Sequence, residues 1–138
     1  GFHRAVSGLL LGIFRSLCGT VEVTPMRILN LEQGRPDRLT ARRLLLSGLE
    51  KARASGHREV KLIHGYGSHG VGGSIRRDTR TTLLQLQEEG QILGFIPGEE
   101  FGPFSELCRQ ALAKNWELTR DPDYARGNSG ITIVLLRR

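Results

Sequence analysis

The stretch HGYGSHGVGGSIRR, residues 64–77, contains five glycines in its first ten positions. It follows the segment Glu59–Ile63, which predicts a β-strand, and it leads into the apolar spacing of a helix over about Ile75–Glu89. Glycine accepts positive φ and lets a bound group approach the backbone closely. Ser74 is the expected N-cap, and free N–H groups at a helix start favour an anion. The stretch therefore predicts a strand–loop–helix unit suited to binding an anion.

Three arginines in the first turns of this helix add fixed positive charge beside the loop. The Gly-Lys-Ser/Thr ending of a P-loop is missing from the sequence, and so is a suitably spaced strand-end acid, which disfavours an NTPase or a dehydrogenase. A glycine loop that is merely flexible is the alternative interpretation. The candidate phosphate-binding residues are Gly65, Gly67, Gly70, Gly72, Gly73, Ser74, Arg76, Arg77 and Arg80.

His64 is expected at the end of the strand, at the mouth of the loop. A histidine in that position can act as a general acid or base near neutral pH. It can equally serve only as a hydrogen-bonding partner of a phosphate or of the backbone. Both roles are open at this point.

The rest of the chain predicts alternating strands and helices. Asp37 is expected to cap the first helix, and the uninterrupted apolar run at the end predicts a strand buried on both faces. The order β-α-β-α-β-α-β indicates an α/β fold, expected as a two-layer sandwich with helices against one sheet. The further elements expected are a strand over 26–31, a helix over about 38–55, a strand over 92–96, a short helix over about 104–112 and a strand over 131–136.

The charge is unevenly distributed along the chain. The chain has 138 residues, enough for one domain, and a net charge of +6. Residues 26–80 carry +7 and residues 81–125 carry −5. A basic surface is the usual footprint of a polyanion partner, so the first segment is expected to supply it. The acidic residues of an insertion at about 97–129 are expected to lie away from that surface.

Several of these residues together resemble the small MutS-related (Smr) domain, over about residues 26–138. The strand before His64, the His64-Gly65-Tyr66-Gly67 run, the glycine loop and the helix start at Ile75-Arg76 match the HGxG motif, loop and helix start of that family. The late strand after Asn128-Ser129-Gly130 matches the family's last strand. The resemblance implies a fold like the C-terminal domain of translation initiation factor three.

The resemblance also implies nucleic-acid binding, since family members are reported as nucleases and several act on mRNA at stalled ribosomes. The family's Leu-Asp-Leu-His motif corresponds here to Leu29-Asn30-Leu31-Glu32, with Asn and Glu in place of Asp and His. Asn30 cannot act as an acid or base, and Glu32 can replace a histidine near pH 7 only if its pKa is raised. The residues at the positions that the resemblance implies to be catalytic are His64, Glu32 and Asn30.

Three functions are the resulting hypotheses. The first is an endonuclease that acts on RNA or DNA phosphodiesters, with His64 as acid or base. The second is a non-catalytic module that binds structured nucleic acid through the glycine loop, Arg76 and Arg77. The third is a protein-interaction module. No cofactor or metal site is predicted, Mg²⁺ dependence is left undetermined, and the expected partner is RNA or DNA, with ribosome association as an expectation from the resemblance.

Residues 1–25 lie outside the resemblance. They have the spacing of an amphipathic helix, which is expected to contact the domain, a protein partner or a membrane surface. No apolar run approaches the roughly 20 residues of a membrane span. Cys18 and Cys108 form no metal-binding or disulfide pattern, so a reducing cytoplasm is the expected location.

Overall fold

The computed structural model describes residues 26–66 and 71–137, and the leader over residues 1–25 lies outside the described part. Nine elements succeed one another within these described residues. They are β1 (Arg27–Asn30), α2 (Arg38–Ala54), β2 (Glu59–Ile63), α3 (Val71–Glu88), β3 (Ile92–Pro97), the 3₁₀ turn η1 (Gly98–Glu100), α4 (Glu106–Lys114), the 3₁₀ turn η2 (Trp116–Arg120) and β4 (Ile131–Leu136). The predicted alternation of strands and helices, and hence the mixed α/β class, is confirmed.

The four strands form one sheet in the order β1-β2-β4-β3. β1 and β2 are parallel, with Asn30 opposite Ile63, while β4 runs antiparallel to β2 and to β3. The carboxyl ends of β1, β2 and β3 therefore meet the amino end of β4 at one edge of the sheet. We call this edge the site edge.

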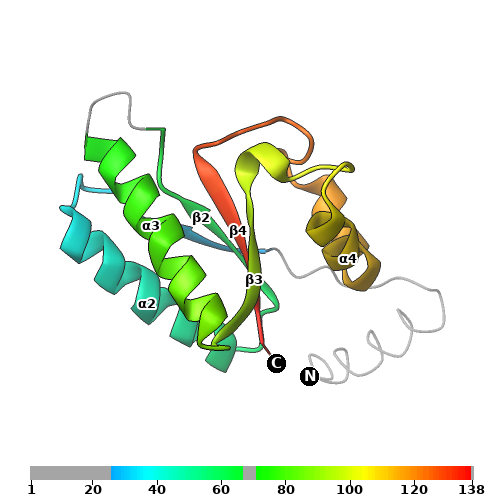
Figure 1. Ribbon diagram of the computed structural model, residues 1–138, viewed down its shortest axis with the longest axis horizontal. Helices are drawn as coiled ribbons and strands as arrows, with labels where there is room; N and C mark the ends of the chain where they lie inside the picture. Colours follow the sequence, from blue (N-terminus) through cyan, green and yellow to red (C-terminus); the bar gives the residue numbers. More distant parts are fainter. Residues whose placement is uncertain (1–25, 67–70, 138) are drawn as a thin grey trace, which may run out of the picture.

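The expected two-layer arrangement is wrong, because helices cover both faces of the sheet (Figure 1). Val60, Leu62 and Val134 pack beneath α2 and α3, whereas Ile133 and Leu135 pack beneath α4 and η2. Successive side chains of a strand point to opposite faces, and every residue of β4 is buried. A strand that is apolar on both sides needs cover on both sides, and α4 supplies the third layer.

The first helix begins as its cap predicts. The Asp37 carboxylate accepts a hydrogen bond from the backbone N–H of Thr40 at 2.7 Å, which satisfies one of the free donors of the first turn. Ala41, Leu45 and Leu49 lie on the buried stripe of α2. Among the described residues, no helix is both long enough and apolar enough to cross a membrane.

Candidate functional site

Asn30, Glu32 and His64 come together at the site edge. The parallel register aligns the ends of β1 and β2, and the Leu31 N–H donates to the Ile63 carbonyl at 2.8 Å. The Glu32 carboxylate lies against Gly65, since a β-carbon at Gly65 would come within 2.7 Å of its Oε1. The Asn30 side-chain oxygen accepts from the Glu32 N–H at 3.0 Å, which closes the turn after β1. Two motifs far apart in the chain thus share one location.

His64 is fully buried at this edge, with both ring nitrogens engaged by the protein. Nδ1 lies 3.1 Å from the Gly65 carbonyl, and Nε2 lies 2.8 Å from the Thr132 hydroxyl. A carbonyl can only accept, so Nδ1 donates and Nε2 accepts the hydroxyl proton. Burial, and to a smaller extent the nearby cations Arg80 and Arg76, lower the pKa of His64 to about 4. The imidazole is therefore neutral at pH 7.

The loop after His64 is held to the start of β4. The N–H groups of His64 and Gly65 both donate to the Gly130 carbonyl at 3.0 Å. Gly65 has a φ of +77°, a conformation that other residues seldom adopt. Gly67 and Gly70 lie outside the described residues.

The helix after the loop begins earlier than the sequence predicts. α3 starts at Val71, so Ser74 lies inside its first turn and is not the N-cap, and Gly72 and Gly73 are helical. Gly73 is buried, as are Ile75 and Leu83 on the same helix. Packing of this face against the sheet extends the helix through two glycines of low helix propensity, because tertiary contacts override propensity.

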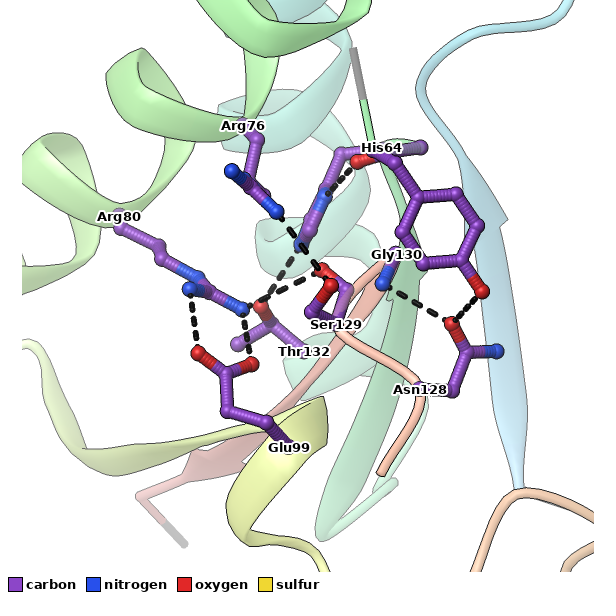
Figure 2. Close-up of polar contacts among 10 residues, drawn as sticks. His64, Arg76, Arg80, Glu99, Asn128, Ser129, Gly130 and Thr132 are labelled. Atoms are coloured by element: carbon purple, nitrogen blue, oxygen red, sulfur yellow. Dashed lines mark hydrogen bonds and ion pairs between the residues drawn. The ribbon is translucent and has the colours of Figure 1, made fainter. Parts of the chain in front are cut away.

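The arginines of α3 differ in their bonding partners. Arg80 is bound to Glu99 through two hydrogen bonds of 3.0 and 2.9 Å. Although partial burial acts to raise the pKa of Glu99, the bonds from Arg80 hold it below its usual value. Within residues 26–66 and 71–137, the one hydrogen-bond partner of the Arg76 guanidinium is the Ser129 hydroxyl, at 3.4 Å, and Arg77 is exposed. Figure 2 shows Arg76 and Arg80 extending from α3 toward Ser129.

Both ends of the acidic insertion lie at this region, and Glu99 is the acidic residue that departs from the expected separation. Glu99 stands beside Arg80, and Asn128 and Ser129 stand beside Gly130 at the site edge. The reason is topological. The insertion leaves from the end of β3 and returns to the start of β4, and both points are at the site edge.

Buried Lys61 anchors the returning end of the insertion. Its ammonium group pairs with Asp121 at 2.7 Å and with Asp123 at 2.5 Å. Asp123 also accepts from the Asn128 amide at 2.8 Å, and the bonds from Asn128 and Lys61 hold the pKa of Asp123 below its usual value. Asn128 in turn accepts from the Tyr66 hydroxyl at 2.5 Å and from the Gly130 N–H at 2.9 Å. A continuous chain of polar contacts therefore connects the core with the loop after His64.

Sequence reasoning missed several residues of this network: Tyr66, Glu99, Asn128, Ser129 and Thr132. Thr132 carried a signal, because it is the one polar side chain in the apolar run 131–136. For Asn128 and Ser129 the sequence indicated only their place before the last strand. No local sequence pattern pointed to Glu99, because only the packing of the folded chain brings it to its partner Arg80. Among the described residues, no group of three His, Cys, Asp or Glu side chains could hold a metal ion.

Comparison with known proteins gives one result for this chain. The family model of the Smr domain matches residues 35–100, a segment that contains α2, β2, the loop after His64, α3 and β3. Asn30 and Glu32, the two departures from the family motif, precede the matched segment. Neither the comparison with curated proteins nor that with solved structures returned a match. The Smr family, whose model matches residues 35–100 of this chain, is known for nucleic-acid binding and nuclease activity.

Proposed function

We propose that this domain binds the phosphodiester backbone of nucleic acid at the site edge, between the start of α3 and the turn before β4. The observation that carries the proposal is the state of Arg76. Among the described residues its guanidinium forms no ion pair, and its one hydrogen bond is a long one to Ser129. Its neighbour Arg80 is neutralised by Glu99, and Arg42 by Asp78. A half-buried cation left without a carboxylate is suited to an anionic ligand.

The surroundings of Arg76 strengthen the attraction for phosphate. Arg77 is exposed in the same helical turn. The first N–H groups of α3 lack partners within the helix, and the helix dipole adds partial positive charge there. The Glu32 carboxylate opposes this field, but it is one charge against the two guanidinium groups of Arg76 and Arg77, neither of which forms an ion pair within the described part of the chain. The net potential at the site edge therefore favours a polyanion.

The environment of His64 favours binding over catalysis by this residue. A general acid must carry a proton near pH 7 and must reach the leaving group. His64 is fully buried and has its pKa lowered to about 4 by that burial, and both ring nitrogens already have partners. These contacts support a role in which His64 holds β2, β4 and the loop together beneath the phosphate site.

An endonuclease is the second candidate, and the position of Glu32 favours it. Glu32 is exposed, lies against Gly65 and belongs to the same edge as Arg76. On RNA, a carboxylate there would take the proton of a 2′-OH as the 2′-oxygen attacks the neighbouring phosphate, and the bond from phosphorus to the 5′-oxygen of the next nucleotide would break to leave a 2′,3′-cyclic phosphate. The departing 5′-oxygen would take a proton from water, while Arg76 stabilises the charge that grows on the phosphate. In this proposal Asn30 positions Glu32 through the turn. Association with ribosomes would result from the same affinity for RNA phosphates.

The binding proposal is tested by matched pairs of charge-removing variants. Arg76→Ala combined with Arg77→Ala removes two cations at the site edge, whereas Arg53→Ala combined with Arg58→Ala removes two exposed cations near the opposite edge. Affinity for an RNA hairpin and for duplex DNA is measured over a range of salt concentrations. Each lost duplex phosphate contact lowers the salt slope by about 0.9. We expect a loss of affinity and a slope lower by about 1 to 2 only in the first pair.

Equal effects of the two pairs would contradict a site at this edge, since they would reflect net charge alone. Cleavage is monitored in the same samples with end-labelled strands, with and without Mg²⁺. Glu32→Gln and His64→Gln are compared with the wild type. Cleavage that is lost in Glu32→Gln but kept in the wild type would establish the second candidate, and binding without any cleavage would exclude it.

A further inference from the structure

The residue after Gly65 is an aromatic side chain that the protein displays and holds in place. Tyr66 has 58% of its surface exposed, although it lies close to the buried His64. Its hydroxyl donates to the Asn128 side chain at 2.5 Å. The hydroxyl end of the ring packs on Gly130, where an added β-carbon would come within 3.1 Å of the ring carbon Cζ. One end of the ring is therefore anchored while much of the side chain remains open to solvent.

The anchor is connected to the core of the domain. Asn128 is bound to Asp123, and Asp123 is paired with the buried ammonium group of Lys61. An exposed tyrosine without such contacts would lose side-chain entropy on binding a ligand. A ring that is already restrained loses less, which is the reason rigid aromatic side chains contribute strongly to binding surfaces.

The ring also lies next to the proposed phosphate site. Ser129 contacts the Arg76 guanidinium, and the next residue, Gly130, contacts the Tyr66 ring. A cation and an aromatic ring thus flank two consecutive residues of one turn. A nucleotide offers the matching pair of groups, a phosphate and a flat base. Only an unpaired base exposes a free π-face, because bases in a duplex are stacked on one another.

We propose that Tyr66 is a stacking platform for an unpaired base whose flanking phosphate is bound by Arg76, so that the domain prefers single-stranded or looped nucleic acid to a continuous duplex. This inference rests on the proposed phosphodiester site and names its substrate class. Asn128 acts in it as a positioning residue, through the hydroxyl of Tyr66. In this proposal, the contacts from Asn128 to Asp123 and Lys61 serve to hold the exposed Tyr66 ring in place for stacking.

The test compares Tyr66→Leu, which keeps an apolar side chain without a π-face, with Tyr66→Phe, which keeps the ring. The probes are short oligothymidylate, short oligouridylate, duplex DNA, and an oligothymidylate that carries an internal run of abasic sites. The unfolding midpoint of each variant is measured first, to establish that it is folded. Stacking on one base predicts that Tyr66→Leu weakens single-strand binding at least about fivefold. Tyr66→Phe should lose less, and duplex and abasic binding should change little in either variant.

The possible outcomes distinguish failure of the stacking proposal from failure of the adjacent phosphate site. A wild type that binds none of the probes overturns the phosphodiester site and the platform with it. A Tyr66→Leu variant that binds single strands as tightly as the wild type overturns the platform alone. So does an equal loss on the abasic strand, because that loss could not come from stacking.

Discussion

Replacing His64 with Gln should flatten the fall in stability that the protein undergoes on acidification between about pH 6.5 and pH 4. Burial lowers the pKa of the folded-state imidazole to about 4 from its usual 6.5. The unfolded chain therefore takes up a proton in this interval before the folded chain does. Stability from this group is complete above the unfolded value and is lost as the pH falls toward the folded value. Each pKa unit corresponds to about 1.36 kcal/mol, so the total is about 3 kcal/mol.

The assay is urea denaturation of the wild type and His64→Gln at a series of pH values. Gln carries a donor and an acceptor but does not titrate, so the difference between the two curves isolates the imidazole. The carboxylates of Asp37, Glu99, Glu106 and Asp123 have lowered pKa values and also destabilise the fold at low pH, but they do so in both proteins. His57→Gln is the control for removing a histidine away from the site edge. Parallel curves for wild type and His64→Gln would refute the reasoning, because they require a solvated imidazole with an ordinary pKa.

Two further substitutions test how the insertion is held to the sheet. Lys61→Met should reduce the free energy of unfolding by about 2 kcal/mol, because Asp121 and Asp123 lose their counter-charge but keep some exposure to water. Urea denaturation measures this loss, and an unchanged unfolding midpoint would contradict an anchoring role of Lys61. Gly98→Ala should cost a similar amount, about 2 kcal/mol, and should weaken oligonucleotide binding, because the new β-carbon would overlap the Asn128 carbonyl oxygen and the Ile131 side chain. Gly102→Ala is its control, since a β-carbon there would make an ordinary contact of 3.4 Å with Ala125, and equal losses in both variants would remove the steric explanation.

The polar network explains how one short loop depends on distant parts of the chain. Tyr66 is held by Asn128, and Asn128 depends on Asp123 and Lys61. A substitution at Lys61 should therefore change how Tyr66 is held, although Lys61 does not contact the loop directly. Binding measurements on Lys61→Met would show this coupling as a loss of affinity for single strands beyond that for duplex.

Some of the site was predictable from short-range patterns. The bounds of β2 (Glu59–Ile63) and of β4 (Ile131–Leu136) agree with the strands that the sequence predicts, and α2 begins at Arg38 directly after its predicted cap, Asp37. Those features depend on neighbouring residues only. The start of α3 was placed too late, since a run of glycines and a serine is typical of a loop with a cap. Burial of Gly73 and Ile75 against the sheet outweighed that local preference.

The amino-acid sequence by itself determined the α/β class, the concentration of positive charge before residue 80 and the motif that locates the loop. Tertiary structure alone decided which arginine pairs with Glu99 and whether the histidine is exposed. Arg76 and Arg80 are equivalent in the sequence, but only Arg80 meets Glu99. By its sequence position His64 is a candidate acid or base, but in the folded domain the Thr132 hydroxyl occupies its Nε2 atom. The physical reason is that burial and charge pairing depend on residues far apart in the chain, which only the packed sheet brings together.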